Sequence, residues 1–373
     1  MYESEFPLDD SVIYLNHAAV SPWPVRTATA VKRFADENVA RGSENHLESV
    51  ELETQLRNQL QRLVNAESSD EIALLKNTSE ALSVVAYGLP WQPGDKVVIS
   101  SHEFPSNRVV WQSLQKLGVN TVAADLASHD SPEAAIIDCL DENTRLLSVS
   151  SVQYGTGLKL DLPRLGAACQ QRDILFCVDA IQSLGAEGFD VQACQADFVM
   201  ADGHKWMMAP EGIALFYCRR SRLPALDLKQ YGWHMLQDAH NFDSPDWEIA
   251  DSARRFECGS PNMTGIHALH ASLSLVEEVG MPVIEKLVLE NTQFIIDFFQ
   301  QRQDRYRLLT PVTAGQHAGI VTFLPLSESS ESLFAQLTQQ QVACALRGGG
   351  IRFSPHFYTP RKKLFSALDM LDG

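Results

Sequence analysis

Residues 174–206 read ILFCVDAIQSLGAEGFDVQACQADFVMADGHKW, and this stretch decides the fold. It holds two short apolar runs, each followed by a charged residue: Asp179 ends the first run, and Lys205 comes shortly after the second. Similar runs, separated by spacers of helical character, occur at residues 97–100, 121–124, 146–150 and 213–217. Repeated runs of this kind are typical of a mainly parallel sheet that helices bury on both faces. We therefore predict an α/β fold.

Polar side chains follow several of the predicted strands. Glu103, Asp179 and Lys205 each come shortly after an apolar run. Ligands of such sheets bind beyond the carboxyl ends of the strands. We therefore expect the functional site at this edge of the sheet.

The length of the chain and a change of pattern predict two domains. A chain of 373 residues is too long for one ordinary core. Helical character is expected at residues 24–65 (ending near Leu63), 267–279 and 283–302, and the last two lead into a smaller unit with strands near 320–323 and 342–345. We predict a large domain over residues 20–264 and a small α+β C-terminal domain over residues 265–373, which residues 1–19 join.

Composition excludes several classes of protein. The hydrophobic content of 45% is typical of a globular protein, and the net charge of −17 argues against a nucleic-acid binder, which needs a basic face. The seven cysteines form no CxxC pair, which favours free thiols in a reducing compartment. We see no signal peptide and no apolar run long enough for a membrane helix. A cytoplasmic protein with no membrane partner is expected, and the spacing of the histidines predicts no metal site.

The Gly203-His204-Lys205 segment suggests covalent cofactor chemistry. A lysine forms a Schiff base only where burial or nearby cations let its amine lose a proton. The cofactor pyridoxal 5′-phosphate (PLP) also needs an acidic partner for its ring nitrogen, and Asp179 is the candidate. Each residue alone has an ordinary explanation, a surface lysine and a helix-capping aspartate. Together they indicate a PLP site on Lys205.

Several further motifs make the chain resemble the class V aminotransferase family, which includes cysteine desulfurases, selenocysteine lyases and isopenicillin N epimerase. The motifs occur in the order of the family: YLNHAA at 14–19, KNTSEA at 76–81, SHEFPSN at 101–107, VDAIQ at 178–182, GHK at 203–205, CGSPN at 258–262 and Arg352. The resemblance implies a PLP-dependent transferase of fold type I, with a mainly parallel seven-stranded sheet flanked by helices. It also implies a homodimer with shared active sites.

The resemblance implies roles for individual residues. Lys205, Asp179 and His204 would be catalytic, and the residues expected to contact PLP are Thr78, Ser79, Phe104, Asp179, Gln182, Asp202, His204, Lys205 and Ser260. Thr78 and Ser79 would hold the phosphate at a helix N-terminus, whereas Ser260 would reach the phosphate of the neighbouring subunit. Phe104 replaces the usual stacking histidine, and Asp202 replaces a small hydroxyl residue. Because an anion beside a phosphate is unfavourable, the orientation of Asp202 stays open.

The substrate is expected to be a small amino acid. Arg352 would bind its carboxylate, with Arg347 as a second candidate, and His17 and Tyr154 would lie near it. Only three glycines and one isoleucine separate the two arginines, where desulfurases place a nucleophilic cysteine, and we expect Cys344 to be buried. We therefore predict a C–S or C–Se lyase that uses no loop-cysteine persulfide. An aminotransferase, an epimerase and a catalytically silent PLP-fold protein are the alternatives.

Overall fold

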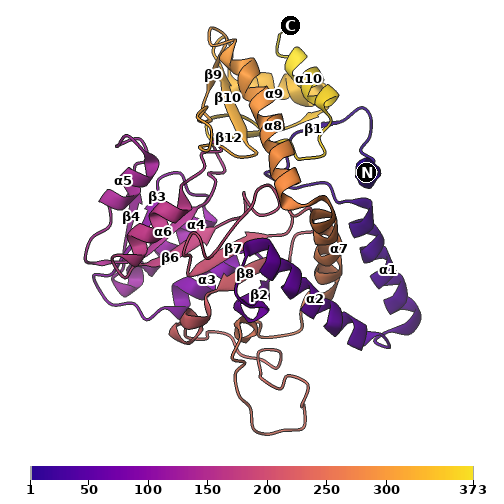
Figure 1. Ribbon diagram of the computed structural model, residues 1–373, viewed down its shortest axis with the longest axis vertical. Helices are drawn as coiled ribbons and strands as arrows, with labels where there is room; N and C mark the ends of the chain where they lie inside the picture. Colours follow the sequence, from indigo (N-terminus) through magenta and orange to yellow (C-terminus); the bar gives the residue numbers. More distant parts are fainter. Residues whose placement is uncertain (1, 373) are drawn as a thin grey trace.

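A computed structural model describes residues 2–372, and a seven-stranded sheet lies at its centre (Figure 1). The strand order is β2-β8-β7-β6-β5-β3-β4. The strands are β2 (Ile72–Leu75), β3 (Lys96–Ser100), β4 (Asn120–Ala124), β5 (Thr144–Ser150), β6 (Leu175–Asp179), β7 (Phe198–Asp202) and β8 (Ala214–Cys218). Neighbours pair in parallel except β8, which runs antiparallel to β7 and β2. The predicted α/β sheet is confirmed, and β2 is an edge strand that the sequence analysis missed.

The sheet is apolar on both faces because alternate side chains enter different cores. Phe176 and Val178 of β6 belong to one hydrophobic cluster, whereas Cys177 between them belongs to another. Helices cover both faces: α3 (Thr78–Gly88) and α4 (Ser106–Gln112) pack in the second cluster, and α5 (Pro132–Asp138) and α6 (Leu162–Gln170) pack in the first. The near-continuous apolar runs of the sequence are therefore those of doubly covered strands.

The N-terminal helical stretch consists of two helices rather than one. The helix α1 spans Val25–Arg41 and α2 spans His46–Val64. Gly42 ends α1 with a φ of 61°, a conformation that suits glycine, and Asn65 ends α2 in the left-handed region. Both helices pack against α7 (Met263–Val279), beside which they lie in Figure 1.

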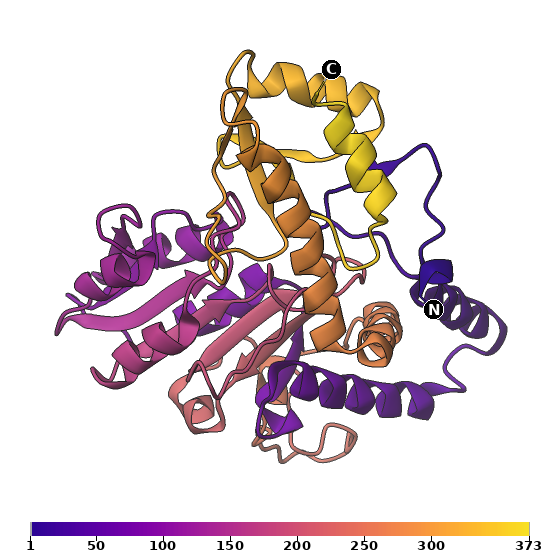
Figure 2. The ribbon, with the colours of Figure 1, turned by 45° about the horizontal axis from the view of Figure 1, so that its top comes forward.

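A smaller unit follows α7. The helix α8 (Met281–Gln300) follows Gly280, begins with Met281 and Pro282, and runs towards a four-stranded antiparallel sheet (Figure 2). That sheet has the order β12-β13-β10-β9, and the elements of the unit are β9 (Tyr306–Leu308), β10 (Val321–Pro325), α9 (Ser330–Gln339), β11 (Val342–Ala343), β12 (Ala345–Arg347), β13 (Gly350–Phe353) and α10 (Arg361–Asp369). From the N-terminal segment, β1 (Ile13–Tyr14) pairs with β11.

The smaller unit has a core of its own. Ile13 and Leu15 pack there with side chains of α8 from Ile295 onward, whereas the first half of α8 and all of α7 pack against the large sheet. The predicted division between residues 264 and 265 stays a prediction. Of the helices within residues 2–372, none combines the length and the apolarity that crossing a membrane requires.

Candidate active site

A cavity of about 240 Å³ lies at the carboxyl ends of β6 and β7. Most of the predicted site residues line it, namely Thr78, Ser79, Phe104, Tyr154, Asp179, Gln182, Asp202, His204, Lys205, Arg347 and Arg352. Residues 347 and 352 come from the small unit, so the cavity lies between the two sheets. Ala18, Ala19, Ser106 and Ile181 complete the lining and were not predicted. The topology thus gathers segments that are far apart in the sequence.

Lys205 and Asp179 line the same cavity: Asp179 ends β6, and Lys205 lies in the loop after the neighbouring strand β7. Burial lowers the pKa of the Lys205 amine, and although Asp179 opposes this shift, the charges of Arg352 and Arg347 add to it. Burial likewise raises the pKa of Asp179, whose Oδ1 accepts the N–H of Ile181 at 3.1 Å. A buried lysine beside two guanidinium groups loses its proton more readily than one in water. Lys205 therefore has the environment of a nucleophilic lysine.

The N-terminus of α3 offers an anion cradle. Thr78 is the first residue of α3, and the Asn77 side chain caps the helix by accepting the N–H of Glu80 at 2.8 Å. The hydroxyl oxygen of Thr78 is buried and has no hydrogen-bond partner among the described residues. Ser79 donates its hydroxyl hydrogen to Ser106 at 2.8 Å. Free donors at a helix N-terminus favour an anion such as a phosphate.

Gln182 and His204 surround the lysine. The Gln182 amide donates to the carbonyl of Ala18 at 3.1 Å and accepts the indole N–H of Trp206 at 2.9 Å, so its orientation is settled. One amide hydrogen remains for a ligand. Burial lowers the pKa of His204 to about 4. The imidazole is therefore neutral at pH 7 and can donate or accept a hydrogen bond without adding charge.

Phe104 and Tyr154 form the aromatic wall of the cavity. Their rings meet edge to face, with centroids 5.1 Å apart, and the Lys205 Nζ lies 5.7 Å from the centroid of Phe104. The neighbouring Glu103 is buried, and it accepts hydrogen bonds from Asn107 at 2.9 Å and from the Ser100 hydroxyl at 2.6 Å. Glu103 therefore anchors the loop that carries Phe104.

Arg352 is a buried cation without a carboxylate partner among residues 2–372. Only 2% of its surface is exposed, and its Nη1 donates to the carbonyl of Tyr154 at 2.9 Å. Its Nε has no partner within the described chain. Burial and the charge of Arg347 lower the pKa of Arg352 to about 10. An ionised guanidinium with a free N–H favours a carboxylate ligand.

Two predicted residues lie elsewhere. His17 is buried, and its ring nitrogens contact the Ser354 carbonyl at 2.7 Å and the Tyr358 hydroxyl at 2.8 Å. It lies outside the lining of the cavity because both nitrogens already have partners in the interior. Ser260 is exposed on a loop that borders a different surface pocket. The predicted roles of both residues stay predictions.

The cavity fits PLP by the chemistry of its donors. Three buried polar atoms there have no hydrogen-bond partner within the described residues: the Thr78 hydroxyl, the Nδ1 of His204 and the Nε of Arg352. Buried polar groups normally have partners, so atoms left free in a cavity indicate a polar ligand. A phosphate and a carboxylate offer the acceptors that the Thr78 hydroxyl and the Arg352 Nε–H lack.

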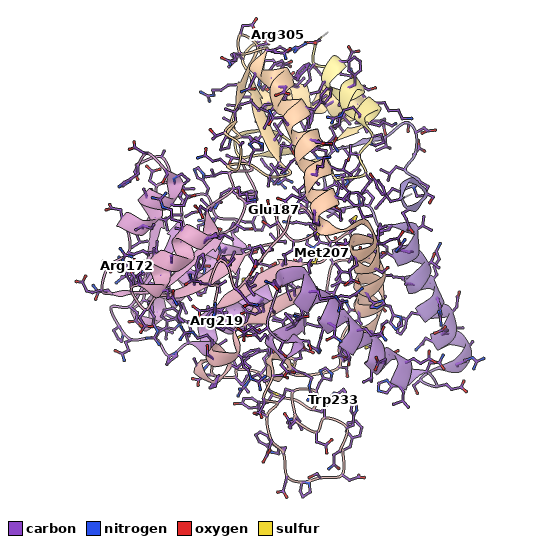
Figure 3. All side chains as sticks on the ribbon, in the orientation of Figure 1. Arg172, Glu187, Met207, Arg219, Trp233 and Arg305 are labelled. Atoms are coloured by element: carbon purple, nitrogen blue, oxygen red, sulfur yellow. The ribbon has the colours of Figure 1, made fainter. Side chains whose placement is uncertain are left out.

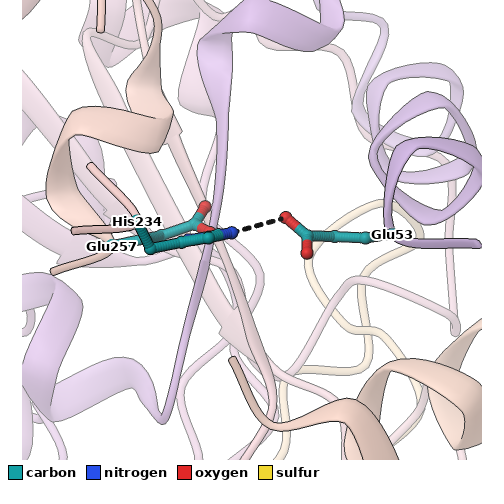
Figure 4. Close-up of side chains that lie close together, drawn as sticks. All are labelled: Glu53, His234 and Glu257. Atoms are coloured by element: carbon teal, nitrogen blue, oxygen red, sulfur yellow. Dashed lines mark ion pairs between the residues drawn. The ribbon is translucent and has the colours of Figure 1, made fainter. Parts of the chain in front are cut away.

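A second charged cluster lies outside the cavity (Figure 4). Glu53 of α2, His234 and Glu257 bring one ligand atom each within 4.8 Å of one another, although the sequence spacing predicted no such group. Arg57 donates from Nη1 and Nη2 to the two oxygens of Glu257 at 2.6 and 2.7 Å, and it also pairs with Glu53. This guanidinium pairs with both carboxylates, so we interpret the cluster as an ion-pair network. The network connects α2 to the segment that carries Trp233 and His234, and Trp233 is labelled in Figure 3.

Comparison with known proteins identifies the family. The family model described as aminotransferase class-V matches residues 13–357. A probable cysteine desulfurase of Methanothermobacter thermautotrophicus is 32% identical over 295 residues, which cover 78% of this chain and 72% of the relative. The fold is also that of the apo cysteine desulfurase from Thermococcus onnurineus NA1 (TM-score 0.87, 24% identity, 100% of this chain and 96% of that one). It is likewise that of the cystine C–S lyase C-DES (TM-score 0.89, 21% identity, 97% of each chain).

The residue matches, the cavity and these comparisons agree. The motifs that suggested the resemblance fall within the matched residues 13–357. This chain therefore belongs to the aminotransferase class-V family of PLP-dependent enzymes.

Proposed function

We propose that this enzyme cleaves a C–S or C–Se bond of a small amino acid by β-elimination, without forming a persulfide on a cysteine of its own. The observation that carries the proposal is the turn between the two arginines of the cavity. Gly348 and Gly349 alone connect β12 to β13. No cysteine is among the residues that line the cavity in the described chain.

The cysteines outside the cavity are poorly suited to take up sulfur. Cys344 is 8% exposed, and burial raises the pKa of its thiol to about 12. A thiol with such a pKa is protonated at pH 7, and only the thiolate is a good nucleophile. Cys139 and Cys258 are partly exposed but do not line the cavity. The sulfur must therefore leave with its own electron pair, as a thiolate or a persulfide.

The residues of the cavity can carry out this reaction. Arg352 binds the α-carboxylate and places the Cα–H bond near Lys205, whose lowered amine pKa suits a general base. When bound, PLP would supply the electron sink for the charge at Cα, and Asp179 would keep the proton on its ring nitrogen. Lys205 Nζ takes the α-proton as the Cβ–S bond breaks. Water then releases pyruvate and ammonia, so cysteine yields sulfide and cystine yields cysteine persulfide.

We also infer a homodimer in which Ser260 of one subunit completes the cofactor site of the other. The support is that Ser260 is exposed and lies outside the cavity of its own chain. Mixing the inactive Lys205→Ala enzyme with Ser260→Ala enzyme tests this inference. A heterodimer would rebuild one site from the two variants, so activity should exceed that of either parent. Activity no greater than that of Ser260→Ala alone would contradict it.

The decisive experiment compares products. The PLP-loaded enzyme is incubated with L-cysteine, L-cystine or L-selenocysteine, and pyruvate, alanine and sulfide are measured. We expect pyruvate in an amount equal to the sulfide from cysteine, the persulfide from cystine or the selenide from selenocysteine. These yields should be unchanged in Cys344→Ser and lost in Lys205→Ala. Alanine as the main product, with loss of activity in Cys344→Ser, would support a persulfide mechanism. Amino transfer to a keto acid or α-proton exchange without sulfide would favour the aminotransferase or the epimerase.

A further inference from the structure

Asp202 occupies the place where the cofactor phosphate is expected. Its Oδ1 accepts the backbone N–H of Thr78, at the start of α3, at 2.6 Å. Its Oδ2 lies 3.5 Å from the Nδ1 of His204. The Thr78 hydroxyl beside it is buried and has no hydrogen-bond partner among residues 2–372. The carboxylate thus accepts a hydrogen bond from one donor of the anion cradle, and the nearby Thr78 hydroxyl also stabilises its ionised form.

A phosphate and an ionised Asp202 compete for the same donor. One N–H cannot make two strong hydrogen bonds, and two anions within hydrogen-bond reach of one donor repel each other strongly in a buried site. A protonated Asp202 has no such conflict because its O–H can donate to a phosphate oxygen. The cradle can therefore hold both groups only when a proton lies between them.

The groups that face Asp202 decide how readily it takes up that proton. Burial raises the pKa of Asp202 to about 6, and the nearby charge of Glu211 adds to the shift. The Thr78 N–H, the charge of Lys205 and the Thr78 hydroxyl oppose this rise. Asp179, on the next strand, contributes a second negative charge to the cavity. Asp202 therefore changes its protonation state close to neutral pH, where a small interaction with a ligand shifts it.

We propose that Asp202 occupies the phosphate cradle in the cofactor-free enzyme and takes up one proton when the phosphate of the cofactor binds. This inference rests on the proposed use of PLP and adds a regulatory consequence to it. Affinity for the phosphate-bearing cofactor falls as the pH rises, because the proton becomes harder to supply. The limit for one coupled proton is about tenfold in Kd per pH unit.

The test uses 4′-deoxypyridoxine 5′-phosphate, which has no aldehyde and cannot react with Lys205. Its Kd for the cofactor-free protein is measured by fluorescence between pH 6 and pH 9. The variants are Asp202→Asn, which keeps the shape of the side chain, and Asp202→Ser, which restores a small hydroxyl. The control Glu211→Gln removes a nearby exposed carboxylate that accepts no hydrogen bond from Thr78.

We expect the Kd of the wild type to rise with pH more steeply than the Kd of either Asp202 variant. The excess should be several-fold to about tenfold per pH unit. The difference isolates Asp202 because ionisation of the ligand is common to all proteins. Glu211→Gln should keep the wild-type slope of Kd against pH, with its midpoint shifted to a slightly lower pH because one charge that raises the pKa of Asp202 is removed. Equal pH dependence in the wild type and both Asp202 variants would overturn the proposal. Failure of every protein to bind the ligand at any pH would refute the use of PLP itself, and the inference with it.

Discussion

The glycine hairpin between β12 and β13 gives a sharp test of how the small unit positions the substrate arginines. Gly348 and Gly349 both have positive φ values, 61° and 85°. A Cβ on Gly348 would lie 2.3 Å from the carbonyl oxygen of Gly155, whereas a Cβ on Gly349 would meet nothing within 4 Å. Gly348→Ala and Gly349→Ala thus share the backbone cost of a left-handed alanine, about 1–2 kcal/mol. They differ in the contact with Gly155.

The size of the expected effect follows from this contact. To move from 2.3 Å to the 3.4 Å of an ordinary contact, the Gly348→Ala hairpin must shift by about 1.1 Å. Gly155 follows Tyr154, whose carbonyl accepts a hydrogen bond from Arg352. A misplacement of about 1 Å can cost about 100-fold in a site that orients its substrate. We therefore expect the Kd of an amino acid to rise by about 10- to 100-fold in Gly348→Ala and by less than about threefold in Gly349→Ala.

The assay follows the absorbance of the PLP-loaded enzyme during titration with L-alanine and with ethylamine. Ethylamine lacks the carboxylate, so its affinity should be similar in the wild type and in both variants. Thermal unfolding provides the check on folding. Gly348→Ala should lose more stability than Gly349→Ala because of its contact with Gly155, and both variants should stay folded at the temperature of the assay. Equal alanine affinity in Gly348→Ala and Gly349→Ala would refute the reasoning. So would a loss of ethylamine affinity as large as the loss for alanine.

Three further predictions concern buried charges. Arg57→Ala should destabilise the protein by about 3–5 kcal/mol in thermal or urea unfolding, because two buried carboxylates lose their cation. The control Arg62→Ala removes an exposed ion pair on the same helix and should cost less than about 1 kcal/mol. Equal losses of stability in the two variants would argue against the buried network. Burial alone would raise the pKa of Glu53, but His234 and Arg57 lower it from 4.5 to about 2. The lowered pKa contributes about 3 kcal/mol of stability, which is present above pH 4.5 and is lost as the pH falls towards 2. The difference in unfolding free energy between the wild type and Glu53→Gln should therefore shrink over that pH range. Asp179→Asn should keep the cofactor on the lysine but lower kcat by about 100-fold or more, because the ring nitrogen loses the anion that keeps its proton; a kcat close to that of the wild type would contradict this role.

The sequence predicted the parts of the fold that depend on local pattern. Strand β6 could be predicted because five consecutive apolar residues end at Asp179. Strand β2 was missed although residues 72–75 are apolar, since only four residues of strand character lie between the long helical stretch, which ends near residue 65, and the next helix. The break between α1 and α2 was missed because a single glycine is its main signal in an otherwise polar helical stretch.

The site shows a similar division. Lys205, Asp179 and the arginines could be predicted because the family motifs mark them. The hydrogen bond between Asp202 and Thr78 could not be predicted, because it joins residues 124 positions apart that meet only where α3 packs against β7. The group of Glu53, His234 and Glu257 likewise has no regular spacing, and only the fold brings it together.

The distribution of charge in the cavity supports the proposal that the substrate bridges both units. The carboxylates of Asp179 and Asp202 come from the large sheet, whereas the cations Arg347 and Arg352 come from the small one. Lys205 lies between these groups, and its amine pKa responds to both. An amino acid satisfies this arrangement when its carboxylate reaches Arg352 and its nitrogen approaches Lys205, so its Cα lies beside the base. Specificity must then depend on where the rest of the substrate points. A side chain whose sulfur leaves readily turns the same proton transfer into elimination.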